Sequence, residues 1–278
     1  MSKHITILLF LVGTSLIAQD TQNSNFQTKN KGKLFVYWGW NRGFYSDSDI
    51  TFKGDDYNFT LNQAKASDRP SEFSIDKYFN PVNITIPQNN YRIGYFFKEN
   101  YTISIGVDHM KYVLDQYQNA SITGEIDEVY APHDGIYDES MKIITKDFLK
   151  FEHTDGLNYI AVEVSRFDDI SSVFNLHSKY FQINVTEGLG VGFMLPKTNT
   201  TLLGKERHDE LHLSGYGVSG RLGLDLGFLK YFFVMSELKG GYINMGDIRT
   251  TQSTSDSAKQ SFWYLQPTII IGGRFKVF

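Results

Sequence analysis

Large apolar residues alternate with small or polar residues along the stretch 181–193. Phenylalanine, isoleucine, valine and leucine occupy odd positions, whereas glutamine, asparagine, threonine and glycine occupy the even ones. A period of two places the two sets on opposite faces of a β-strand. Strands of soluble sheets span about five or six residues, whereas a tilted strand that crosses a membrane needs about 9 to 11. This stretch is therefore predicted to cross a membrane.

The same alternation recurs along the chain and gives eight predicted strands. They are residues 33–44, 90–97, 101–113, 157–167, 180–193, 213–228, 231–243 and 262–278. The connections between them are alternately long and short, as in bacterial barrels with long extracellular loops and short periplasmic turns. The pattern predicts an all-β fold, an antiparallel transmembrane β-barrel of eight strands with long extracellular loops.

Two of the long connections, 45–87 and 115–155, are polar and rich in acidic residues. Within the first, residues 50–61 still alternate weakly, so we expect strand extensions that rise above the membrane. If this segment and its neighbour crossed the membrane instead, the barrel would have ten strands. Ten strands are the alternative to eight.

The first 18 residues are typical of a secretory signal peptide. A short basic start precedes an apolar run at 5–12, and small residues follow as far as Ala18. The run is too short to span a membrane as a helix. We expect cleavage after Ala18, with an uncleaved anchor as the alternative. Residues 19–32 are predicted to be a flexible periplasmic lead-in, and residues 33–278 a single barrel domain.

Composition fits a barrel and excludes several other classes of protein. The chain has 22 Phe, 17 Tyr and 24 Gly, yet its mean hydropathy is only -0.30, because only alternate residues of a barrel strand face lipid. The absence of cysteine excludes disulfides and thiolate metal sites. A net charge of -4 argues against nucleic acid as a partner. No cofactor is predicted.

Charged residues fall on the face that the alternation turns inward. Both signs are present: Arg92, Asp108, Glu163, Arg221, Asp225, Glu237, Lys239 and Arg274. An eight-stranded barrel is just wide enough for its side chains to fill. Because an unpaired buried ion is costly, we expect these charges to pair in a filled, salt-bridged interior. A narrow solute channel is a weaker alternative.

The signal peptide, the eight strands rich in glycine and aromatic residues, and the ending at 274–278 together resemble the small outer-membrane β-barrel proteins. Within that family, the chain resembles the eight-stranded, OmpA/OmpX-like barrel proteins that are common in Gram-negative bacteria of the Bacteroidetes type. The resemblance implies an integral protein of the bacterial outer membrane, in contact with lipid and lipopolysaccharide. Members usually end in an aromatic residue that the barrel-assembly machinery reads, and Phe278 matches.

The resemblance implies location and fold more than activity. We therefore predict a structural or surface-interaction role, in which any extracellular ligand binds through the loops. Such a role is motivated by the filled interior and the long loops, and it needs no catalytic residue.

One cluster offers an enzymatic alternative. His153, Asp155 and Asn158 precede or begin a predicted strand at its extracellular end. They are faintly similar to the His-x-Ser-Asn motif of lipid A 3-O-deacylase barrels, in which a serine attacks and a histidine is its base. Asp155 stands at the serine position, and the alternation turns it inward with His153, away from lipid. A hydrogen bond from His153 to Asp155 or Glu152 is expected, and a lipid A-modifying hydrolase is the alternative function.

A second cluster has spacing that suits a metal ion. His208, Glu210 and His212 would share one face of an extended segment and could bind a divalent cation there. The related zincin motif needs a helix to bring its two histidines together, whereas this segment leads into a strand. We expect a solvated loop and no metal site.

Overall fold

The computed structural model describes residues 29–79, 87–178 and 180–276. The predicted signal peptide 1–18, most of the predicted lead-in 19–32, and Phe278 lie outside the described residues. Nearly all regular structure in the described part of the chain is β-strand. No helix among the described residues is long and apolar enough to cross a membrane.

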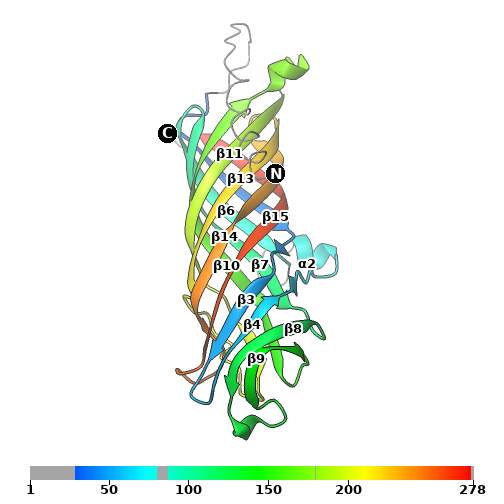
Figure 1. Cartoon of the computed structure of the whole chain (residues 1–278). Helices are drawn as coiled ribbons and strands as arrows, with labels where there is room; N and C mark the ends of the chain where they lie inside the picture. The colour runs from blue at the N-terminus through cyan, green and yellow to red at the C-terminus, as the bar shows by residue number, and fades with distance from the viewer. Residues whose placement is uncertain (1–28, 80–86, 179, 277–278) are drawn as a thin grey trace, which may run out of the picture.

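Eight long antiparallel strands form a closed barrel. They are β1 (Lys33–Asn41), β6 (Asn89–Lys98), β7 (Tyr101–Leu114), β10 (Leu149–Asp169), β11 (Phe181–Met194), β13 (Gly215–Phe228), β14 (Phe232–Arg249) and β15 (Ser257–Lys276). Each strand pairs with the next in this order, and β1 pairs with β15 to close the barrel. Figure 1 shows these strands tilted around a common axis. The predicted eight-stranded antiparallel barrel is confirmed.

Apolar side chains cover the outside of this barrel. In β11, Leu189, Val191 and Phe193 are exposed, whereas Gly190 between them is buried. Other strands continue the same surface, which we call the lipid belt; it includes Val36, Ile93, Ile103, Ile105, Val162, Val164, Val218, Leu222, Leu224, Val234, Leu238, Leu265, Ile269 and Ile271. An outward apolar band of this kind is what the hydrocarbon core of a membrane requires. The fold is a transmembrane β-barrel.

Several strands continue beyond the lipid belt. β10 has 21 residues and β15 has 20, about twice what a membrane crossing needs. Four short strands pair with the long barrel strands: β2 (Phe44–Tyr45), β3 (Ser48–Lys53), β5 (Ala66–Ser67) and β12 (Asn199–Leu202). Three more continue the sheet outward from β3: β4 (Tyr57–Ala64), β8 (Asn119–Ile126) and β9 (Gly135–Ile143). We call these short strands, with the strand ends beside them, the head. It forms the lower part of Figure 1.

The ten-stranded alternative is wrong. β3 pairs with residues 257–260 of β15, and β4 pairs with β3, so both lie beside the distal end of the barrel wall and do not enter the closed barrel. Residues 50–61 do lie in strands, as expected, but these are a separate hairpin of β3 and β4 beside β15, not extensions of the barrel strands. The described residues also form three short helices: α2 (Ile75–Phe79), η1 (Glu128–Tyr130) and η2 (Ser171–Phe174).

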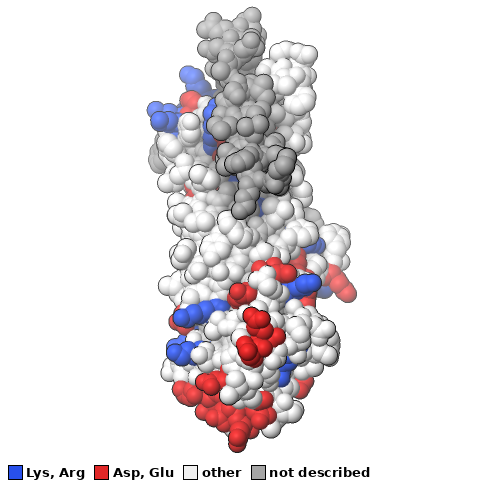
Figure 2. Space-filling model, in the orientation of Figure 1, with Lys and Arg blue, Asp and Glu red and all other residues white. Residues whose placement is uncertain are grey.

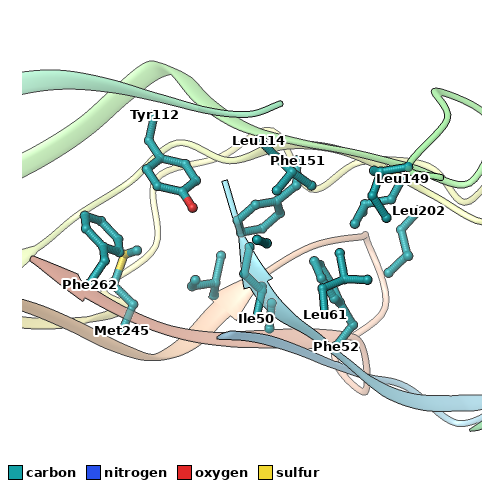
Figure 3. Packing of buried hydrophobic residues seen from close by; sticks show 14 of the residues in the cluster. Ile50, Phe52, Leu61, Tyr112, Leu114, Leu149, Phe151, Leu202, Met245 and Phe262 are labelled. Atoms are coloured by element: carbon teal, nitrogen blue, oxygen red, sulfur yellow. The ribbon is translucent and has the colours of Figure 1, made fainter. Parts of the chain in front are cut away.

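The head has an apolar core of its own. Ile50, Phe52 and Leu61 point inward from β3 and β4 and are fully buried (Figure 3). The Phe52 ring lies 5.2 Å from that of Phe59 and 5.3 Å from that of Phe151, measured between centroids. The long polar connections are therefore not solvated loops throughout, because their alternating residues fill the distal end of the barrel.

Candidate functional site

Six of the predicted interior charges form one network at the centre of the barrel. Lys239 Nζ donates to Asp108 Oδ2 at 2.6 Å and lies 2.8 Å from Glu163 Oε1. Arg92 Nη2 lies 2.8 Å from the same Glu163 oxygen, and Arg221 Nε lies 3.1 Å from Glu163 Oε2. Arg221 also pairs with Glu237. We call these six residues the inner network; its three cations balance its three carboxylates.

The strand alternation and one small residue position this network. Its members come from β6, β7, β10, β13 and β14, each at an inward position. Between β10 and β13 lies Gly190 of β11, where an added Cβ would stand 2.6 Å from Glu163 Cγ and 2.7 Å from Ser219 Oγ. The glycine therefore leaves the space into which the Glu163 side chain extends.

Asp225 and Arg274 form a separate pair nearer the turn end of the barrel. Asn184 Nδ2 donates to Asp225 Oδ1 at 2.8 Å, and the Arg274 guanidinium lies over the rings of Phe167 and Phe233, 4.7 and 4.3 Å from their centroids. Aromatic faces attract a guanidinium electrostatically. All eight predicted interior charges thus have an oppositely charged partner.

The interior leaves little free space between these two groups. A cavity of about 30 Å³ lies there, lined among others by Tyr37, Arg221 and Met235. This volume accommodates one or two water molecules. On the side of this cavity that faces the head, the inner network fills the barrel, and the apolar core of the head follows. The arrangement is that of a plugged barrel.

The structure does not bring His153, Asp155 and Asn158 together. Two extra residues in β10, between His153 and Leu157, form a bulge against β7 that interrupts the alternation locally, although odd-numbered residues face inward again from Leu157 onwards. Asp155 is consequently exposed, so its expected inward orientation is wrong. Asn158 Oδ1 bonds instead to His109 Nδ1 at 2.8 Å.

His153 is buried in the head core, away from any carboxylate. Its Nδ1 bonds to Thr198 Oγ1 at 3.1 Å, and its ring packs against those of Tyr112 and Phe151. The expected bond to Asp155 or Glu152 is not made; Glu152 pairs with Arg69 at 2.8 Å. Complete burial lowers the pKa of His153 to about 3.

Acidification is expected to loosen the head through His153. The folded state holds the imidazole neutral, whereas the unfolded state binds a proton below its pKa of 6.5. Stability is therefore lost as the pH falls from about 6.5 towards 3, by about 1.4 kcal/mol per pH unit. Hydrogen exchange of head amides at pH 7 and pH 4.5 should show this loss, and it should be smaller in His153→Gln. His212→Gln, which alters a partly exposed histidine, should behave as the wild type does; equal losses in both variants would contradict the assignment.

The three candidate metal ligands, His208, Glu210 and His212, are likewise not brought together into one site. His212 Nε2 pairs with Asp247 Oδ2 at 3.0 Å, Glu210 is exposed, and the rings of His208 and His212 lie 6.3 Å apart at right angles. Within the described ranges, no group of three or more His, Asp or Glu side chains is arranged to hold a metal ion.

An open sheet edge lies at the tip of the head. β9 pairs with β8 on one side, and no described strand pairs with its other side. Ile136, Met141 and Ile143 are 88%, 68% and 54% exposed. They lie opposite Glu125, Ser121 and Asn119 of β8, on the outer face of the sheet. We call this free side of β9, with its three apolar residues, the β9 edge.

The surroundings of the β9 edge are acidic. The segment 125–139 has six carboxylates and neither lysine nor arginine: Glu125, Asp127, Glu128, Asp134, Asp138 and Glu139. Asp55 and Asp56 come close, because Asp127 N donates to Asp56 O at 2.9 Å. Figure 2 shows acidic side chains gathered at the lower tip of the molecule. The tip thus combines negative charge, exposed apolar side chains and unpaired backbone groups.

No protein-family model matches the sequence, and no curated protein matches it. Similar solved structures include the outer membrane protein OprG from Pseudomonas aeruginosa, at 12% identity over 91% of this chain and 100% of that chain, with a TM-score of 0.39. Ail, the attachment invasion locus protein of Yersinia pestis, has 12% identity, 88% and 99% coverage and a TM-score of 0.28. The N-terminal β-barrel domain of Pseudomonas aeruginosa OprF has 9% identity, 88% and 98% coverage and a TM-score of 0.28. Identities and TM-scores this low establish nothing about this chain. Its barrel fold is shown by its own strand pairing.

Sequence reasoning missed the β9 edge. Its apolar residues alternate with polar ones, but one extra residue in β9 opposite the step from Ile122 to Gly124 breaks the period. Glu139, with φ of 51°, lies within this irregularity. A search for a period of two therefore finds only acidic residues in this section. The turn residues Pro132 and Gly135 are the signal that could have indicated a strand starting there.

Proposed function

We propose that this chain is an integral protein of the outer membrane of a Gram-negative bacterium, and that its head binds an extracellular partner along the β9 edge. The lipid belt supports insertion in a membrane. In the orientation typical of such barrels, the head lies outside the cell and the short turns face the periplasm. Lipid and lipopolysaccharide then surround the belt, and the barrel-assembly machinery inserts the chain.

The observation that carries the proposal is the open edge of β9. An unpaired strand presents a row of N–H and C=O groups that can pair with another strand. Natural proteins usually shorten, charge or cover such edges. β9 carries charges at Asp138, Glu139 and Lys142, yet it is nine residues long and leaves three apolar side chains exposed at the tip of the head. Addition of a strand from a partner would satisfy the backbone groups and cover the apolar side chains.

Charge defines the chemistry of that partner. The acidic tip favours an extended segment in which basic residues alternate with apolar ones, because such a segment offers opposite charge and a matching apolar face. A second copy of this chain would bring two acidic tips together, which like-charge repulsion opposes. The plugged interior supports a role at the surface in preference to transport, and the separation of His153 from Asp155 supports a role other than lipid hydrolysis.

The proposal predicts binding of a synthetic peptide of alternating lysine and valine to the protein in lipid nanodiscs. Binding should protect the backbone amides of β9 from hydrogen exchange. The double variant Ile136→Lys/Met141→Lys should bind at least tenfold more weakly, because it removes the apolar contacts and adds repulsive charge. A matched double variant at the turn end, Val173→Lys/Phe174→Lys, also alters exposed apolar residues and should bind normally.

A peptide in which glutamate replaces lysine tests charge complementarity. It should fail to bind, since it would meet carboxylates of the same sign. Equal binding of both peptides, or unchanged affinity in the β9 variant, would disprove the proposed edge.

A further inference from the structure

We propose that α2, together with Phe73, lies in the outer leaflet of the membrane and binds lipid acyl chains, as a side anchor of the barrel. α2 belongs to the first long connection, and Figure 1 shows it projecting sideways from the barrel wall, next to the start of the head. The proposal concerns a surface outside the β9 edge and is independent of partner binding there.

The helix is fixed to the outside of β1. Trp40 Nε1 donates to the carbonyl oxygen of Tyr78 at 3.0 Å, and Arg42 Nη2 donates to the Tyr78 hydroxyl at 3.4 Å. Tyr78 is buried, and its hydroxyl donates to the Ser71 carbonyl at 2.8 Å. These contacts hold α2 against the barrel wall, so its exposed side chains have a defined position.

Those exposed side chains are large and apolar. Phe73, Ile75 and Phe79 are 73%, 74% and 50% exposed. Ile75 and Phe79 are four residues apart and therefore share one face of the helix. Exposing these three side chains, two on α2 and one just before it, to water is unfavourable and creates an apolar patch that favours association with another apolar surface.

Continuity with the lipid belt identifies what covers this face. The Phe79 ring lies 5.0 Å from that of Trp40 and 6.4 Å from that of Trp38, measured between centroids. Both tryptophans lie on the outward face of β1, where Val36 belongs to the belt. The apolar face of α2 thus extends the surface that already contacts lipid, and lipid covers it without any further partner.

The polar residues of the segment are compatible with this depth. Asp76 follows Ile75 directly, so it points about 100° away from it around the helix axis. Its carboxylate can remain among the headgroups while Ile75 contacts acyl chains. Tryptophans such as Trp38 and Trp40 are typical of the boundary between headgroups and hydrocarbon, where an amphipathic segment inserts.

Site-directed labelling tests the anchor cleanly, because the chain has no cysteine. Ile75→Cys would carry an environment-sensitive fluorophore, and the protein would be folded into vesicles of phosphatidylcholine with brominated acyl chains. Bromine quenches only fluorophores that reach the hydrocarbon. Leu189→Cys, in the lipid belt and 71% exposed, is the positive control, and Glu128→Cys, at the tip of the head, is the negative control.

We expect quenching at position 75 to exceed half of that at position 189, with none at position 128. Quenching below half of the Leu189→Cys value would overturn the proposal. Heat-modifiable gel mobility of each labelled protein shows whether it has folded, and all three positions are exposed, so folding should be retained. Loss of peptide binding at the β9 edge would leave this result unaffected.

Discussion

Lys239→Met is expected to lower the free energy of unfolding of the barrel by about 3–5 kcal/mol. Lys239 is fully buried and contacts Asp108 and Glu163 at 2.6 and 2.8 Å. Methionine of similar size removes the charge and leaves three carboxylates with two guanidinium groups. The uncompensated buried charge is the main cost, because a barrel interior offers little water to solvate it.

The double variant Lys239→Met/Glu163→Gln separates charge balance from packing. It retains Arg92 and Arg221 with Asp108 and Glu237, so the interior is neutral again, and much of the lost stability should return. Urea unfolding from lipid vesicles, followed by tryptophan fluorescence, measures all variants. Lys259→Met, at an exposed position of β15, should change little. A loss below about 1 kcal/mol in Lys239→Met, or no recovery in the double variant, would show that the inner network is not a balanced unit.

Phe52→Ala is expected to destabilise the head by about 3–5 kcal/mol while the belt region keeps its fold. The side chain is fully buried and packs against Phe59 and Phe151, so truncation removes apolar contacts and leaves a cavity. The head is held mainly by this apolar core, whereas the belt region is also held by barrel closure and by the inner network. The two regions should therefore respond separately.

Hydrogen exchange resolved by peptide would show this separation. Amides of β3, β4 and β8 should exchange faster in Phe52→Ala, and those of β11 and β13 should keep their rates. Ile136→Ala truncates an apolar residue that is 88% exposed and should leave both sets unchanged. Equal acceleration in both regions would mean that head and barrel unfold as one unit.

The sequence was enough to predict the barrel wall. Alternation within a strand determines which face each residue occupies, independently of the strands that follow. The lipid belt residues near Leu189 and the inward charges could therefore be assigned from the sequence of each strand alone. Eight segments alternate in this way, and long and short connections follow one another between them. That order is expected of a closed antiparallel barrel, because its chain returns to the same side of the membrane after every second strand.

The ion pairs, the head core and the position of α2 were decided by the tertiary structure, because they depend on how strands far apart in the sequence are aligned with one another. Which ions pair around Glu163 follows from the stagger between five strands, and no single strand encodes that stagger. Bulges before Leu157 and at Glu139 locally interrupt the alternation of inward and outward side chains. As a result Asp155 is exposed, and the apolar side chains of β9 could not be recognised from a period of two. The head core and the docking of α2 on Trp40 depend on contacts between segments far apart in the chain, and short-range periodicity carries no information about such contacts.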